Sequence, residues 1–341
     1  MKYLLGLILS LGLLAGCATT GVEGQSTVEV VELPPLFEPE VPQDDHLVGA
    51  NINIGALRGP TGIGLAQLMA RSEDGLTVNN YNFTLGGAPE EMTAGLINGS
   101  LDIATVPVNV ASVLYNMTDG DVRMIAVNTL GVLFVLDATG EIETISDLEG
   151  RTINATGQGA TPQFALEHIL NENGINATIV YNTEHTELAS LMIAGNVELG
   201  VLPQPFVTTV TMQNPDINVA LDLTAEWEAV NSGSAFVQGA IVARQSFIEE
   251  NPDAIVLFLQ DQAESVAFVT NNVEEASQLT GRFDIIPPPV ALQAIPRSNL
   301  VHIIGDDMRP LVNSFLEVVY NANPQAVGGS LPDENFFFVA E

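Results

Sequence analysis

The chain of 341 residues is poor in cysteine and in basic residues, and each shortage excludes a class of function. Cys17 is the only cysteine, so no disulfide forms within the chain and no thiol chemistry is expected of its folded part. Nine basic residues stand against 42 acidic ones, a formal net charge of −33. Because a polyanion needs a basic face, nucleic acid is excluded as a partner.

Histidine is also scarce, and its four copies are too scattered for the spacing of metal ligands. The sequence contains no Gly-x-Ser-x-Gly segment of the kind that carries a catalytic serine. An enzyme would need a nucleophile, a metal set or a tuned acid–base pair. We therefore expect neither a metal nor another cofactor, and no enzymatic activity.

A short apolar run at residues 4–14 follows a single positive charge at Lys2. The run is too short to span a membrane and is typical of a signal peptide. It ends in Leu14-Ala15-Gly16-Cys17, which resembles the lipobox of bacterial lipoproteins. We predict a lipoprotein signal peptide at residues 1–16 and an exported protein. Its lipidated Cys17 would anchor it to the bacterial cell membrane, on the extracellular face or in the periplasm.

Residues 17–47 are rich in proline and acidic residues and show little periodicity. Such a segment cannot bury enough apolar surface to order itself, so we predict a lipidated, disordered tether. The folded region is then 48–341, which is long enough for two lobes with sizeable cores.

The folded region repeats two phrases in the same order. Gly-Pro-Thr at 59–61 is echoed by Gly-Ala-Thr at 159–161, and residues 97–107 are echoed by residues 193–203. The nearly constant offset of roughly a hundred residues is the size of a small domain. We therefore predict two similar lobes with a cleft between them, which suggests a bound small molecule.

Strand and helix patterns alternate within each repeat, which predicts an α/β fold with parallel sheets. The expected strands are 51–57, 80–85, 102–106 and 124–128 in the first repeat, and 152–155, 179–181, 199–202 and 219–221 in the second.

Two further apolar runs, at 130–136 and 236–243, are predicted to form a two-strand hinge. Lobe 1 is then expected to comprise 48–130 plus 237–341, and lobe 2 to comprise 131–236. Helices over 252–270, 273–280 and 308–322 are expected to brace lobe 1.

The lipobox, the tether, the two lobes and the phrase Arg244-Gln245-Ser246-Phe247-Ile248-Glu249-Glu250-Asn251-Pro252 together resemble the type II solute-binding proteins of ABC importers. The closest subgroup serves nitrate, sulfonates, taurine and the pyrimidine precursor of thiamine. The resemblance implies a periplasmic-binding-protein type II fold with two Rossmann-like lobes. It also implies a small-molecule solute, ABC permease subunits as partners, membrane contact through the lipid anchor, and a monomer.

Ligands of open α/β sheets sit beyond the carboxyl ends of the strands, where helix N-termini offer free N–H groups. The loops before the two repeated helices fit this rule, and the resemblance implies that they contact ligand. The candidate ligand-binding residues are Arg58, Gly59, Pro60, Thr61, Gly87, Ala88, Pro107, Asn109, Thr129, Gly157, Gly159, Ala160, Thr161, His185 and Gln204.

Several of these residues have an alternative structural role. Arg58 either clamps an anionic group of the solute or forms an internal salt bridge with an acidic neighbour. Thr61 and Thr161 either contact ligand or cap the helices that follow them. His185 either binds a polar ligand or pairs with Glu184 at the surface.

The sequence therefore favours capture of a small polar or anionic organic solute outside the cell and its delivery to an ABC importer. An enzyme of the same fold acting on a small metabolite is the first alternative. A surface lipoprotein that acts as an adhesin or interaction module is the second.

Overall fold

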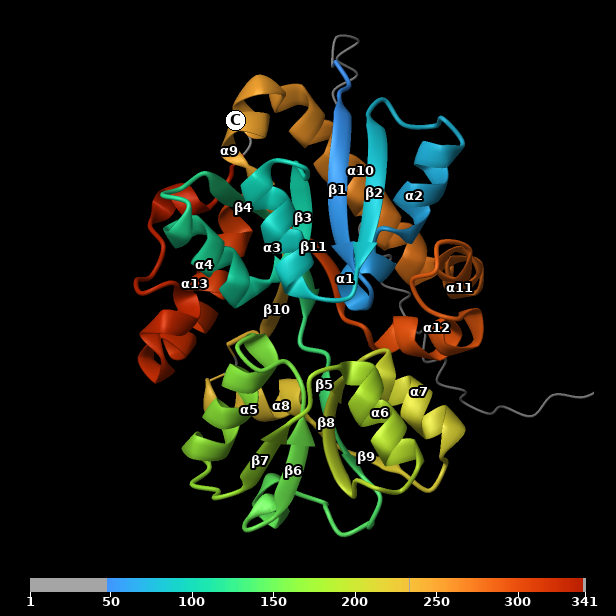
Figure 1. Ribbon diagram of the computed structural model, residues 1–341, viewed down its shortest axis with the longest axis vertical. Helices are drawn as coiled ribbons and strands as arrows, with labels where there is room; N and C mark the ends of the chain where they lie inside the picture. The colour runs from blue at the N-terminus through green and yellow to red at the C-terminus, as the bar shows by residue number, and fades with distance from the viewer. Residues whose placement is uncertain (1–47, 233, 340–341) are drawn as a thin grey trace, which may run out of the picture. The chain divides into compact units, whose positions relative to one another are not determined.

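The computed structural model describes residues 48–232 and 234–339, which form two β-sheets flanked by helices (Figure 1). The predicted signal peptide, the tether and Cys17 lie outside the described residues. The α/β fold class and the two-lobe architecture are confirmed. None of the described helices is long and apolar enough to cross a membrane.

The first sheet has six strands in the order β11-β4-β10-β3-β1-β2. β1 pairs in parallel with β2 and β3, whereas β10 runs antiparallel to both β3 and β4. The strands are β1 (Asn51–Leu57), β2 (Asn80–Gly86), β3 (Ile103–Pro107), β4 (Val122–Leu130), β10 (Val237–Arg244) and β11 (Leu300–Ile303).

The second sheet has five strands in the order β7-β6-β8-β5-β9. β5 lies between β8 and β9 and runs antiparallel to both. It corresponds to β10, which lies between β3 and β4 in the first sheet. The strands are β5 (Leu133–Asp137), β6 (Thr152–Ala155), β7 (Thr178–Tyr181), β8 (Leu199–Pro203) and β9 (Asn218–Asp222). Apart from β11, the two sheets thus share one strand order, as the internal repeat predicts.

Helices cover both faces of each sheet (Figure 1). Those of the first lobe are α1 (Pro60–Ile63), α2 (Ala66–Glu73), α3 (Pro89–Asn98), α4 (Val108–Met117), α9 (Gln245–Glu250), α10 (Pro252–Asn271), α11 (Val273–Arg282), α12 (Pro288–Ala294) and α13 (Gly305–Ala322). Those of the second lobe are α5 (Thr161–Glu172), α6 (His185–Ile193), α7 (Phe206–Gln213) and α8 (Leu223–Val230). Short 3₁₀ turns lie at Ile145–Leu148 (η1), Ile295–Arg297 (η2), Pro324–Val327 (η3) and Glu334–Phe336 (η4).

One hydrophobic core runs from the first lobe into the second. At its centre Trp227 of α8 lies 5.3 Å from Phe236 and 5.1 Å from Phe315 of α13, measured between ring centroids. All three rings are almost completely buried. Aromatic side chains bury large areas, so this cluster ties the two lobes together on one side.

The predicted strand at 130–136 is wrong in one respect, because the structure interrupts it. β4 ends at Leu130 and β5 begins at Leu133, with Gly131 and Val132 crossing between the sheets. A Cβ atom at Gly131 would lie 2.2 Å from Thr224 Oγ1 and 2.6 Å from the Phe236 ring. This close approach requires glycine. Three α-helices were not predicted at all: α8, α9 and α12.

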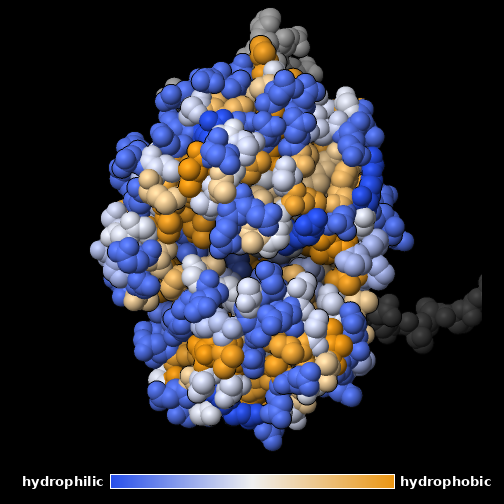
Figure 2. Space-filling view, viewed as in Figure 1, coloured by the Kyte–Doolittle hydropathy of each residue, from blue (hydrophilic) through white to orange (hydrophobic). Residues whose placement is uncertain are grey.

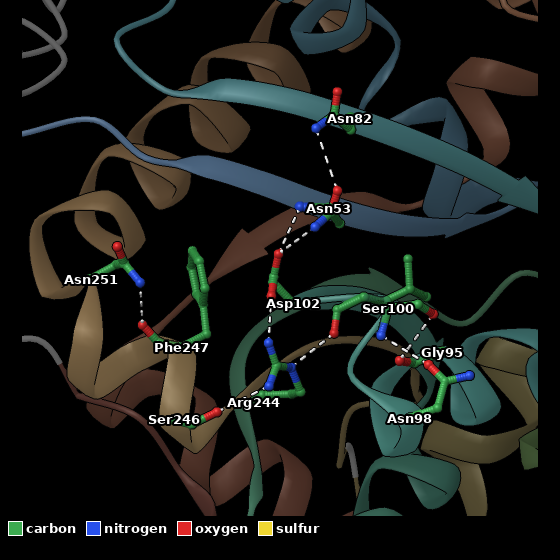
Figure 3. A network of polar contacts seen from close by, with 11 residues as sticks. Asn53, Asn82, Gly95, Asn98, Ser100, Asp102, Arg244, Ser246, Phe247 and Asn251 are labelled. Carbon is green, nitrogen blue, oxygen red and sulfur yellow. Dashed lines mark hydrogen bonds and ion pairs between the residues drawn. The ribbon is translucent and has the colours of Figure 1, made fainter.

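The phrase that begins at Arg244 has a structural role at the end of the first sheet opposite the carboxyl ends of β1 and β3 (Figure 3). Arg244 Nη2 forms an ion pair with Asp102 Oδ1 at 2.6 Å, and its Nε donates to the carbonyl oxygen of Leu101. The other oxygen of Asp102 accepts from the backbone and side-chain nitrogens of Asn53 at 2.9 and 3.0 Å. These contacts join β10, β3 and β1.

Candidate functional site

A cavity of about 490 Å³ lies between the two sheets, a volume that suits a small molecule. Residues at or just beyond the carboxyl ends of β1, β2 and β3 form one wall, and residues following β6, β7 and β8 form the other. The hollow between the lobes is seen near the middle of Figure 2. This is the position expected for a ligand of an open α/β sheet.

Most of the candidate residues lie on the wall of this cavity. They are Arg58, Pro60, Thr61, Gly87, Ala88, Pro107, Thr129, Gly157, Ala160, His185 and Gln204. Both repeated loops therefore face one space, one from each lobe. That these residues contact ligand stays a prediction.

Four candidates do not line the cavity: Gly59, Asn109, Gly159 and Thr161. The two glycines serve the loop backbone, with φ angles of 132° at Gly59 and 78° at Gly159 that favour glycine. The carbonyl of Gly59 accepts from the N–H groups of Gly62 and Ile63, which starts α1.

Asn109 and Thr161 instead bond to each other across the lobes. The Oδ1 of Asn109 accepts from Thr161 Oγ1 at 3.1 Å. Its Nδ2 donates to the carbonyl oxygens of Gly159 at 3.2 Å and Ala326 at 3.1 Å. Both side chains are buried, and the amide of Asn109 forms its hydrogen bonds with the protein itself.

The expectation that threonines cap the repeated helices is wrong. The N-cap residues are Gly59 for α1 and Ala160 for α5, and neither makes a side-chain cap bond. Thr61 Oγ1 lies 3.3 Å from Thr105 Oγ1, and Thr161 is already the first residue of its helix.

Side chains of the protein accept hydrogen bonds from N–H groups at two helix N-termini near the cavity, and one of these, at Gly159, belongs to a loop that was expected to offer free N–H groups. The backbone nitrogens of Gly87 and Ala88 donate to Oε1 of Glu91 at 3.0 and 3.1 Å. The nitrogen of Gly159 donates to Oε1 of Gln163 at 2.7 Å. At the N-termini of α3 and α5, a side chain of the same helix therefore accepts from these backbone N–H groups.

Arg58 forms the salt bridge that was one of its two predicted roles, whereas its contact with an anionic group of a solute stays a prediction. It lines the cavity, and its Nε donates to the carbonyl oxygen of Asp284 at 3.1 Å. Its Nη2 lies 3.4 Å from Asp284 Oδ2, and the two side chains are 44% and 94% exposed. An ion pair this exposed is weak, so it holds Arg58 only loosely.

Four polar atoms on the cavity wall have no hydrogen-bond partner in the structure: Thr129 Oγ1, Asn182 Oδ1, Gln204 Nε2 and Gln238 Oε1. Thr129 and Gln238 come from the first sheet, whereas Asn182 and Gln204 follow strands of the second. Gln204 is oriented by Thr208, whose hydroxyl donates to its Oε1 at 2.8 Å. Buried polar groups are normally paired, so four unpartnered atoms on one wall are unusual.

The sequence reasoning missed Asn182, Gln238 and Gly239 on this wall. Gln238 is a polar residue at the start of an apolar strand, and Asn182 directly follows β7 at its carboxyl end. Both patterns are readable in the sequence and are the signals that could have identified them. A Cβ at Gly239 would lie 2.5 Å from Asn128 Oδ1, so glycine is required there.

His185, the first residue of α6, is not paired with Glu184 as one alternative held. Its Nδ1 lies 2.6 Å from Thr156 Oγ1, and its ring centroid lies 5.0 Å from that of Phe206. Burial lowers the pKa of His185 to about 4, so the ring is neutral at pH 7.

This lowered pKa predicts a pH dependence of stability. Between pH 6.5 and about 4 the unfolded chain binds a proton at His185 that the folded chain does not. The free energy of unfolding should therefore fall as the pH is lowered through this range. Above pH 6.5 the ionisation of His185 should not affect it. We expect the stability advantage of wild type over His185→Gln to shrink by about 1–2 kcal/mol between neutral pH and about pH 5. Denaturant titrations of both proteins measure this, and a constant advantage would contradict it.

No cluster of three His, Cys, Asp or Glu side chains arranged to hold a metal ion occurs within residues 48–232 and 234–339. His168 bonds to Asn231 at 2.9 Å through Nε2, and His302 bonds to Gln262. Both lie away from the cavity wall and serve the packing of the fold.

A protein family and several solved structures are similar to this chain. The sequence pattern of a family described as NMT1/THI5 like matches residues 73–276. No curated protein sequence matches the chain.

Solved structures resemble the chain over most of its length. An ABC transporter from Parabacteroides distasonis has a TM-score of 0.74 at 21% identity, over 87% of this chain and 100% of that one. The periplasmic aliphatic sulphonate binding protein SsuA from Escherichia coli has a TM-score of 0.69 at 17% identity, over 85% and 92%. The periplasmic nitrate-binding protein NrtA from Synechocystis PCC 6803 has a TM-score of 0.59 at 12% identity, over 81% and 82%. These likenesses establish the fold.

Proposed function

Because the chain belongs to the NMT1/THI5-like family, we propose that it is the extracytoplasmic solute-binding component of an ABC importer. It captures a small polar or anionic organic solute in the cavity between its lobes and delivers it to the permease subunits. The similarity to binding proteins for sulphonate and nitrate supports this role. The lipidated Cys17 holds the protein, a monomer, at the bacterial membrane.

The observation that carries the proposal is the convergence of unpartnered polar atoms from both lobes on one cavity. A solute that bonds to Gln204 and Asn182 on one side and to Thr129 and Gln238 on the other stabilises the closed arrangement. Two crossings between the sheets, at Gly131–Val132 and before Val237, leave the lobes able to move about a hinge. Binding of the solute and closure of the lobes are then coupled equilibria.

The test is direct identification of the solute and of its contacts. The purified protein is denatured, and any small molecule it releases is identified by mass spectrometry. Its affinity is then measured by calorimetry, together with nitrate, taurine, ethanesulfonate and 4-aminopyrimidine as probes. We expect one molecule bound per chain without conversion to a product; turnover would favour the enzyme alternative instead.

Gln204→Ala is expected to weaken binding of that molecule about tenfold, because a hydrogen bond to it is lost. Gln278→Ala is the matched control, since Gln278 is exposed on α11 and does not line the cavity. Equal affinities in the two variants would mean that the molecule does not bind in the cavity through Gln204.

A further inference from the structure

The charge of the cavity wall bears on the chemistry of the solute. Arg58 is the only cationic side chain among the described residues of the wall, and Asp284 already bonds to it. Glu90 and Glu184 also line the cavity, and both are exposed at its edge. An anion entering the cavity therefore meets more negative charge than positive charge.

At two helix N-termini beside the cavity, side chains of the protein already take the position that an anion would occupy. The carboxylate of Glu91 accepts from the N–H groups of Gly87 and Ala88 at the start of α3. The amide oxygen of Gln163 accepts from Gly159 at the start of α5. A sulfonate or nitrate would have to displace these acceptors, and near α3 it would meet a like charge.

The interior of the cavity offers neutral groups instead. Gln204 and Thr129 are fully buried, and Gln204 Nε2 and Thr129 Oγ1 have no hydrogen-bond partner in the structure. Asn182 and Gln238 add two more amide groups. Amides and hydroxyls donate and accept without adding charge. The wall between them is apolar, formed by Leu57, Pro60, Pro107, Val132 and Phe206.

From this arrangement we infer that the cavity takes an uncharged, hydrogen-bonding solute and discriminates against anions such as sulfonates and nitrate. The inference rests on the proposed function and narrows its substrate class. A cationic solute is also disfavoured, because no carboxylate on the described part of the wall is buried where it would neutralise one.

The test uses probe pairs that differ in charge and hardly in shape. Nicotinamide is compared with nicotinate, and ethanesulfonamide with ethanesulfonate, by calorimetry on the full chain. The charge of the molecule released on denaturation is determined in parallel. We expect that molecule to be neutral at pH 7 and any binding pair to favour its neutral member at least about tenfold.

The outcomes separate the inference from the proposed function. A released anion or cation, or a pair bound without this preference, would overturn the inference and leave solute binding intact. Failure to release any molecule or to bind any probe would count against the proposed function, and the inference would fall with it.

A variant pair tests the role given to Glu91. Glu91→Gln removes the charge that occupies the N-terminus of α3 and should increase the affinity for ethanesulfonate several-fold. Glu274→Gln is the matched control, because it removes the same charge from the first turn of α11 and Glu274 does not line the cavity. An equal change in both variants, or no change, would contradict the blocking role.

Discussion

Asn109→Ala is expected to weaken binding of the molecule that the purified protein releases by about ten- to hundredfold. The amide of Asn109 is buried and bonds from α4 of the first lobe to Gly159 and Thr161 of the second. Because both bonds join the two lobes, they must break when the lobes move apart. Losing them leaves buried polar groups unpaired in the closed form at a cost of about 1–3 kcal/mol, so the open form gains population.

Two measurements check this expectation. Calorimetry gives the change in Kd, and small-angle X-ray scattering of the solute-free protein should give a larger radius of gyration for the variant. Asn116→Ala is the matched control on the same helix. Asn116 donates to the carbonyl oxygens of Val327 and Ser330 at 2.8 Å, so it contacts the same C-terminal segment as Asn109 without reaching the second lobe. If both variants bind equally well, Asn109 has no part in closure.

Arg244→Met is expected to lower the free energy of unfolding by about 3 kcal/mol, the usual consequence of breaking a buried ion pair from one side. Asp102 is only 9% exposed and would keep its bonds to Asn53 but lose its cationic partner. The change should not weaken solute binding, because neither residue lines the cavity. Denaturant unfolding measures the first effect and calorimetry the second.

Arg282→Met provides the comparison for this variant. Arg282 pairs with Glu73 at 2.5 Å, but the two side chains are 47% and 56% exposed. Exposed pairs contribute about 0–1 kcal/mol, so this variant should lose far less stability than Arg244→Met. Equal losses would mean that the Asp102 carboxylate is not effectively buried.

The sequence predicted the strand positions well because strand periodicity is a local property. The echo between residues 97–107 and 193–203 marks the same helix-to-strand turn in both lobes, α3 to β3 and α6 to β8. The break at Gly131 was missed because its cause is tertiary. Only the folded chain brings Thr224 and Phe236 against that residue.

The candidate site was predicted at the level of loops and less well at the level of side chains. Pattern reasoning placed both repeated loops at the cavity, but it could not know which residues the protein would use itself. Asn109 carries a polar side chain just beyond β3, as Gln204 does beyond β8. Asn109 uses its amide in contacts between the lobes, whereas Gln204 belongs to the cavity wall and keeps an unpartnered Nε2. Glu91 lies in the first turn of α3, and its hydrogen bond with the Gly87 nitrogen follows from the folded geometry of that turn.

The position of β10 has a consequence for the order in which the protein can assemble. β10 separates β3 from β4, so the first sheet is missing a central strand until residues 237–244 have been synthesised. All strands of the second sheet lie within residues 133–222 and emerge earlier from the ribosome. The lobe encoded in the middle of the gene is therefore the first that can complete its sheet, and the lobe that starts the polypeptide is finished last.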